Sequence, residues 1–160
     1  MRLIIAAVGR LKDGPERELL ERYRQRFGAM GKRLGLAPIV WHELAESRAA
    51  TAAKRAEEEG AALLKLARDA DTIIALDERG KALTSEGFAH LVRKTRDGGC
   101  GTMAILVGGP DGLAPAVREA AHTVLSLGAI TLPHGLARIV LAEQLYRAAT
   151  ILAGHPYHRA

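Results

Sequence analysis

The sequence has 160 residues, of which 48% are hydrophobic and 26% are charged, so it is long and apolar enough to bury one substantial core. Its longest apolar runs, such as Leu3–Val8, have five or six residues, which excludes a membrane-spanning helix. The single cysteine, Cys100, excludes an internal disulfide and a cysteine-based zinc site. The first residues lack the features of a signal peptide. We therefore expect one cytoplasmic domain over residues 1–160.

Basic residues are concentrated in the first part of the chain. The net charge is +5, from 23 basic and 18 acidic residues. Residues 1–35 contain nine lysines and arginines against four acidic residues, so they carry the whole excess. A localised basic excess is typical of proteins that bind a polyanion such as RNA. It is also typical of a solvated helix face, and charge alone leaves both interpretations open.

The first half of the chain alternates between strand and helix patterns. In chain order, we expect a strand at Leu3–Val8, a helix from about Pro15 to Lys32, a strand at Leu36–Glu43 and a long helix ending near Ala67. Asp13 is a candidate cap for the first helix, with Glu16 completing a capping box. Ser47 is a candidate cap for the second helix.

The second half continues the same alternation. We expect a strand at Thr72–Leu76, a polar turn at Asp77–Lys81, a helix at about Ser85–Arg96, a strand at Thr102–Val107, a glycine-rich loop at Gly108–Gly112, a short helix begun by Pro115, a strand at Val124–Leu127 and a helix at about Leu136–Ala153. Strands that alternate with helices predict parallel pairing, so the fold class is α/β with a parallel sheet. We find no internal repeat and no linker.

Three strand ends have unusual sequences. In open parallel sheets, ligands bind where the carboxyl ends of the strands meet. Here these ends are Leu76, the loop Gly108–Gly112 and the segment Leu127–His134. The glycine-rich loop lacks the G-x-G-x-x-G pattern, and no Lys-Ser/Thr follows it, so dinucleotide and nucleoside triphosphate cofactors lose support. Two ordinary tight turns remain an alternative interpretation.

The segment after the last predicted strand is unusually apolar for a loop. It contains Leu127, Ala129, Ile130 and Leu132. A loop of this kind can line a slot for an aromatic base and read the edge of the base through its peptide groups. This composition favours an adenine-containing ligand that does not require strong neutralisation of phosphate.

The C-terminal part carries further candidate groups. The tail His155–Arg159 combines two histidines with a tyrosine and an arginine, but no carboxylate accompanies them as a metal site would require. The last helix is apolar on nearly all sides, which indicates burial on more than one face, and we expect another subunit as the second cover. Glu143 and Arg147 have the spacing of a structural ion pair. Cys100 is interpreted as a packing residue.

The combination of these motifs resembles one family. The segments on which this resemblance rests are Leu3–Gly9, Ala75–Asp77 with Gly80–Lys81, Val107–Gly112, Leu125–Leu127 with Thr131–His134, Ala142–Ala148 and His155–Arg159. In order, spacing and length they are similar to the ribosomal large subunit pseudouridine methyltransferase H family, a minimal branch of the SPOUT methyltransferases. The resemblance covers essentially the whole chain.

The resemblance implies a fold and an activity. The fold is an α/β-knot domain whose C-terminal part forms a trefoil knot, working as a homodimer. The activity is methylation of N3 of a pseudouridine in 23S ribosomal RNA on assembled 70S ribosomes, with S-adenosylmethionine as cofactor and without a metal or a membrane. By the resemblance, the cofactor-binding residues are Leu76, Gly108, Leu127, Gly128, Ala129, Ile130, Thr131 and Leu132.

The resemblance also gives the tail a role at the target nucleotide. We hypothesise that Tyr157 orients the base, His158 accepts the proton and Arg159 contacts a phosphate or a base carbonyl, with water as an alternative proton acceptor. The candidate RNA-binding residues are Arg10, Lys12, Arg17, Arg22, Arg24 and Arg26. Two other functions remain open: a non-catalytic ribosome-binding or assembly factor, and a SPOUT methyltransferase that acts on transfer RNA.

Overall fold

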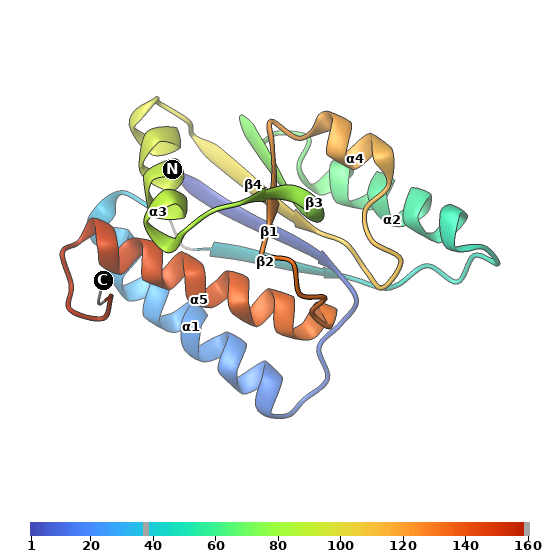
Figure 1. The fold of residues 1–160 in the computed structure, drawn as a ribbon, viewed down its shortest axis with the longest axis horizontal. Helices are drawn as coiled ribbons and strands as arrows, with labels where there is room; N and C mark the ends of the chain where they lie inside the picture. Colours follow the sequence, from blue (N-terminus) through green and yellow to red (C-terminus); the bar gives the residue numbers. More distant parts are fainter. Residues whose placement is uncertain (37–38, 159–160) are drawn as a thin grey trace.

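A computed structural model describes residues 1–36 and 39–158 of the chain. The described residues form one parallel sheet in the order β2-β1-β4-β3-β5 (Figure 1). Its strands are β1 (Arg2–Val8), β2 (Ile39–Leu44), β3 (Thr72–Ala82), β4 (Thr102–Val107) and β5 (Thr123–Ser126). The predicted parallel α/β class is therefore confirmed.

Helices cover both faces of the sheet. They are α1 (Pro15–Gly31), α2 (Ala52–Leu66), α3 (Ser85–Asp97), α4 (Pro115–Ala120) and α5 (His134–Leu152), with a 3-10 turn at Lys32–Leu34. Helices α1, α3 and α5 lie on one face, and α2 and α4 lie on the other (Figure 1). In β1, Ile5 packs with the first group and Ala6 with the second, because successive side chains of a strand point to opposite faces. No helix in the described ranges is long and apolar enough to cross a membrane.

Both predicted helix caps are wrong. The residue before α1 is Gly14, without a side-chain cap, so Asp13 and Glu16 form no capping box. Helix α2 begins later than predicted, because the Thr51 hydroxyl accepts a hydrogen bond from the Lys54 N–H at 3.2 Å. The Ser47 hydroxyl instead hydrogen-bonds to Glu58. Two residues of the predicted second strand, 37 and 38, lie outside the described residues.

The third strand does not end at Leu76, and residues Asp77–Lys81 are not a free turn. The strand continues through a bulge to Ala82, so that Leu125 of β5 pairs with Leu76 and again with Lys81. Gly80 lies directly against the β5 backbone, since a Cβ there would lie 2.5 Å from the Leu125 carbonyl carbon. A side chain at position 80 therefore has no space. The strand crosses β5 closely because this residue is glycine.

Helix α5 is covered within the chain. It packs against α1 and α3 and lies between them (Figure 1), and ten of its residues are buried. This packing accounts for most of the apolar composition for which we expected a second subunit.

A buried arginine joins α5 to the end of β1. Arg138 is fully buried, donates to the Val8 and Gly9 carbonyls and lies 3.3 Å from a carboxylate oxygen of Glu43. Arg17 donates to the same carboxylate at 2.8 Å. Partial burial acts to raise the pKa of Glu43, but hydrogen bonds from Arg17 and the Leu11 N–H, together with the two arginine charges, outweigh it and hold the pKa below its usual value. The network fixes the start of α5 beside the carboxyl end of β1.

The crossing at Gly80 makes a prediction about stability. Replacing Gly80 with alanine places a methyl group against backbone that cannot move aside, and we expect it to lower the free energy of unfolding by about 3 kcal/mol or prevent folding. Gly28→Ala is the matched control, because a Cβ at that helical position meets nothing within 4 Å and should stabilise by about 0.5–1 kcal/mol. Urea denaturation measures both. If the two variants were equally stable, the claim that β5 leaves no space for a side chain at position 80 would be wrong.

The Glu43 network makes a prediction about acid stability. Since the folded-state pKa of Glu43 lies below the unfolded value, its contribution is present above the unfolded pKa of about 4.3 and is lost as pH falls through the folded pKa. Glu43→Gln should destabilise by about 1 kcal/mol at pH 7. It should also lose less stability than the wild type between pH 5 and pH 3. Unfolding curves at a series of pH values test this, and an unchanged acid slope would refute it.

Candidate functional site

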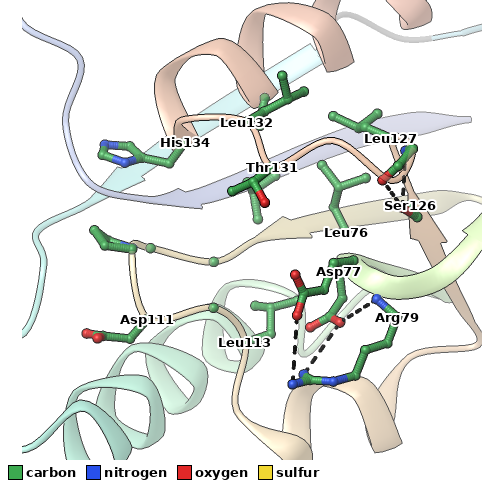
Figure 2. A pocket seen from close by; sticks show the side chains of 18 of the residues that line it. Leu76, Asp77, Arg79, Asp111, Leu113, Ser126, Leu127, Thr131, Leu132 and His134 are labelled. Carbon is green, nitrogen blue, oxygen red and sulfur yellow. Dashed lines mark hydrogen bonds and ion pairs between the residues drawn. The ribbon is translucent and has the colours of Figure 1, made fainter.

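A cavity of about 330 Å³ opens at the carboxyl edge of the sheet, where β4 and β5 end and β3 passes through its bulge (Figure 2). Three segments line it: the bulge of β3, the glycine-rich loop and the apolar loop before α5. The lining residues are Leu76 to Arg79, Val107 to Leu113, Ser126 to Gly128, Ile130 to Leu132, His134 and Ala137. Its volume is at the lower end of the range typical of small-molecule sites, about 300–1,000 Å³.

The cavity brings together most of the residues predicted to bind a cofactor. Those that line it are Leu76, Gly108, Leu127, Gly128, Ile130, Thr131 and Leu132. Ala129 is not among the lining residues. The carboxyl ends of neighbouring parallel strands meet at one edge, and this geometry collects residues that lie up to 56 positions apart in the sequence.

The glycine-rich loop is held in shape from both sides. Gly109 and Gly112 form an isolated bridge, and a Cβ on Gly108 would lie 2.8 Å from the Gly112 carbonyl. Arg55 of α2 binds Asp111 with two hydrogen bonds of 2.7 and 3.1 Å. These contacts fix the loop backbone before any ligand arrives, so its peptide groups are preorganised at the cavity wall.

The apolar loop has a fixed start and an exposed middle. The Ser126 hydroxyl donates to the Gly128 carbonyl at 3.0 Å and accepts from the Gly128 N–H at 3.1 Å. Thr131 and Leu132 then face Leu76 across the cavity (Figure 2). Ile130 is 82% exposed, although it also lines the cavity. Ile130 therefore lies at the rim, where the cavity opens to solvent.

Sequence reasoning missed the polar side of the cavity. Asp77, Glu78 and Arg79 line it, and we had interpreted them as a turn. Asp111 and His134 also line it. The available signal was three charged residues placed directly after a buried strand, at the edge where ligands bind.

The predicted catalytic tail lies elsewhere on the molecule. The Tyr157 ring packs against Tyr146 with 4.7 Å between centroids, and its hydroxyl donates to Glu143 at 3.1 Å. Burial, followed by hydrogen bonds with Tyr23 and Glu143, raises the pKa of Tyr157. His158 Nε2 lies 2.6 Å from a carboxylate oxygen of Glu86.

The structure therefore does not bring the tail and the cavity of one chain together. Neither Tyr157 nor His158 lines the cavity. The third predicted residue of the tail, Arg159, lies outside the described residues. The predicted Glu143–Arg147 ion pair is confirmed at 2.6 Å. Arg147 also stacks on the Tyr157 ring, so the tail packs against both members of this ion pair.

The candidate RNA-binding residues fall into two groups. Arg10, Lys12, Arg22 and Arg26 are exposed. Arg24 is half-buried, with Glu21 at 2.5 Å and the Trp41 ring beneath it. Arg17 is held by Glu43 and the Leu11 carbonyl, so its guanidinium is engaged in the fold.

Two further features bear on ligand chemistry. Within residues 1–36 and 39–158 there is no group of three or more histidine, cysteine, aspartate or glutamate side chains placed to hold a metal ion. A second, largely apolar cavity of about 360 Å³ lies between β3, β5, α3 and α5. It shares Leu76 and Ser126–Gly128 with the first cavity but not Gly108 or the loop after Gly128. The first cavity is therefore the one that collects the predicted cofactor residues.

Comparison with known proteins gives close relatives over the full length. A protein of Rhodopseudomonas palustris (strain HaA2) called "Ribosomal RNA large subunit methyltransferase H" is 52% identical over 160 residues, which is the whole of both chains. A protein of Methylobacterium sp. (strain 4-46) with the same name is 53% identical over 159 residues, covering 99% of this chain and 98% of that one.

Solved structures share the fold at low sequence identity. A probable methylase family protein from Haemophilus influenzae Rd KW20 has a TM-score of 0.54 and 11% identity, covering 99% of this chain and 70% of that one. A probable methyltransferase from Bordetella pertussis Tohama I has a TM-score of 0.53 and 18% identity, covering 92% and 95%. The family model described as "Predicted SPOUT methyltransferase" matches residues 1–158. The chain belongs to the SPOUT methyltransferase family.

Proposed function

We propose that the protein is an S-adenosylmethionine-dependent methyltransferase that modifies N3 of a pseudouridine in the 23S RNA of assembled ribosomes. The observation that carries this is the cavity at the strand ends, which collects seven of the eight predicted cofactor residues in a chain about half identical to proteins named ribosomal RNA large subunit methyltransferase H. The name of those relatives supports the RNA substrate. The pseudouridine and the assembled ribosome rest on the family resemblance.

The cavity fits the adenosine part of the cofactor. Apolar side chains such as Leu76 and Leu132 offer flat contacts to a base, and the two loops offer peptide groups to its edge. Among the described lining residues the one lysine or arginine is Arg79, so the cavity lacks the cluster of basic groups that a polyphosphate would need. When bound, S-adenosylmethionine supplies a methyl group on a positively charged sulfur, and the transfer leaves S-adenosylhomocysteine.

The residues of this chain have three tasks in such a transfer. They must hold the base in line with the methyl group, exclude water and accept the proton that leaves N3. We assign orientation of the base to Tyr157, acceptance of the proton to His158 and a phosphate or carbonyl contact to Arg159. No covalent nucleophile is needed. Half-buried Cys100 bonds within the fold, to the Thr102 carbonyl.

The separation of the tail from the cavity favours a homodimer. The docked tail contacts Glu86, Glu143 and Tyr146, none of which lines the cavity. We propose that the tail of one subunit completes the cavity of the other. Ile130 at the rim and Leu136 in the first turn of α5 are exposed and apolar, as expected of a surface that a second subunit covers.

The crossing of β3 over β5 supports the proposed trefoil knot. Residues 77–82 pass against β5, and the chain then leaves β5 to place α5 between α1 and α3. We propose that this passage threads the C-terminal segment through the loop made by residues 77–82 and the connection to β4.

The exposed basic residues form the proposed RNA surface. Arg10 and Lys12 follow β1 at the edge that carries the cavity, since a Cβ on Gly9 would lie 3.3 Å from His134 Nε2. Arg22 and Arg26 extend this surface along α1. The two pairs therefore give RNA phosphates a path that begins beside the cavity.

The activity has a direct test. Methyl-labelled S-adenosylmethionine is incubated with ribosomes that lack the modification, with isolated subunits and with transfer RNA. We expect label in 23S RNA from 70S ribosomes, and loss of at least about a hundredfold for Leu127→Arg, which fills the cavity, and for deletion of residues 155–160. His158→Ala should also lower the methylation rate, whereas the control His90→Ala, which changes an exposed histidine on α3, should leave it unchanged. Label in transfer RNA would show that transfer RNA, and not ribosomal RNA, is the substrate. Tight binding to ribosomes without any label would indicate a non-catalytic binding factor.

The RNA surface has a separate test. Changing Arg22 and Arg26 to glutamine should lower the slope of log K against log salt by about two, because each phosphate contact contributes about one. Lys54→Gln with Arg68→Gln, on the α2 side, is the control and should leave the slope unchanged. Ribosome binding at several salt concentrations measures both. Equal slopes for the two double variants would refute this placement.

A further inference from the structure

The proposed cofactor cavity has a charged end. Its middle is formed by Leu76, Thr131 and Leu132, whereas the three residues that follow Leu76 are Asp77, Glu78 and Arg79 (Figure 2). His134 and Asp111 lie on the other side of the cavity (Figure 2), and Asp111 is occupied by Arg55. The cavity therefore has an apolar middle and, at one end, both acidic and basic side chains.

The carboxylate of Asp77 is fixed at this end. Its side chain is only 4% exposed, one oxygen accepts the Arg79 N–H at 3.0 Å and the other accepts from Arg118 at 3.4 Å. The same Arg118 nitrogen also donates to the Leu113 carbonyl, which therefore lies close to the Asp77 carboxylate. A buried carboxylate with its charge compensated in this way presents a preorganised negative group to a ligand.

The guanidinium of Arg79 is available for a ligand. Its side chain is 65% exposed, and its ion pairs with Asp77 and Glu78 are long, at 3.7 and 3.9 Å. Arg55, by comparison, is held by Asp111 at 2.7 and 3.1 Å. Among the described residues that line the cavity, Arg79 is the one lysine or arginine. A planar guanidinium with free donors matches a carboxylate with two parallel hydrogen bonds.

The backbone that carries these two residues is held at both ends, because Leu76 before them and Lys81 after them both pair with Leu125 of β5. Gly80 is pressed against β5, and Lys81 and Ala82 continue the pairing with that strand. The positions of Asp77 and Arg79 are therefore set by the crossing and not by a mobile loop. Groups with fixed positions bind a charged ligand at a lower entropic cost.

We propose that Asp77 and Arg79 form the subsite for the amino-acid end of the cofactor. Arg79 would donate to the α-carboxylate, and the negative charge of Asp77 would favour the α-ammonium and the positive sulfur at this end of the cavity. The proposal rests on the placement of the cofactor in this cavity. It adds that the charged end selects the amino-acid part, while the apolar middle holds the adenosine part.

A pair of ligands separates the two ends. S-adenosylhomocysteine carries both the adenosine and the amino-acid part, whereas 5′-methylthioadenosine lacks the amino-acid part. Calorimetry measures the binding of each to the full-length protein. Arg79→Ala should weaken S-adenosylhomocysteine about tenfold, which corresponds to about 1.4 kcal/mol, and change 5′-methylthioadenosine less than twofold. Arg79→Lys should fall between the wild type and the alanine variant, because it keeps the charge but not the paired donors.

Two further variants complete the series. Asp77→Asn keeps an acceptor for the Arg79 N–H and removes the charge, so it should weaken S-adenosylmethionine about tenfold and leave 5′-methylthioadenosine unchanged. Arg68→Ala is the matched control, since Arg68 is 73% exposed, pairs with its neighbour Asp69 and precedes β3 at the opposite edge of the sheet. It should change neither ligand. Thermal unfolding of each variant verifies that the fold is retained.

The outcomes are distinct. Arg79→Ala that binds S-adenosylhomocysteine like the wild type, or that weakens both ligands equally, overturns the subsite. Leu127→Arg should abolish binding of both ligands by filling the cavity. If the Leu127→Arg variant binds both ligands as tightly as the wild type does, the cofactor binds elsewhere, and both the proposed site and its subsite are wrong.

Discussion

The close passage of β3 across β5 is the contact on which the rest of the site depends. Leu125 pairs with both Leu76 and Lys81, and Gly80 lies where any side chain would collide with the Leu125 backbone. A strand that ended at Leu76 would leave the next charged residues in a solvated turn. Because the strand continues round β5, these residues are held at the wall of the cavity instead. The same contact fixes Ser126, where the apolar loop begins.

Helix α5 links this edge of the sheet to the tail. Its first turn lies at the cavity, and buried Arg138 fixes it to the carbonyls at the end of β1. These carbonyls lie beyond the last ladder bonds of a buried strand and need donors, which the guanidinium supplies. Further along the same helix, Glu143 and Arg147 bind the Tyr157 side chain. One helix therefore presents both parts of the proposed active site, on different turns and facing different surroundings.

Local patterns predicted the elements because hydrophobic periodicity reflects burial, and burial decides most of this fold. The strand Leu3–Val8 is uniformly apolar since both faces of β1 are covered. Caps were less predictable, because Ser47 and Thr51 are both good caps and only the path of the chain chooses between them. The extension of β3 had no local signal. Residues 77–81 have the composition of a turn, and their strand pairing is made with residues more than 40 positions away.

The candidate site also has a part that the sequence predicted and a part that it did not. The cofactor residues were brought together because the ends of parallel strands converge, whatever the sequence between them. The tail was not, since its docking joins Tyr157 to Glu143 and His158 to Glu86, and no local pattern predicts contacts between segments that lie 14 and 72 positions apart. The Tyr157 ring packs on Tyr146 and against the core of this face, so within one chain the tail is held against α5 and away from the cavity.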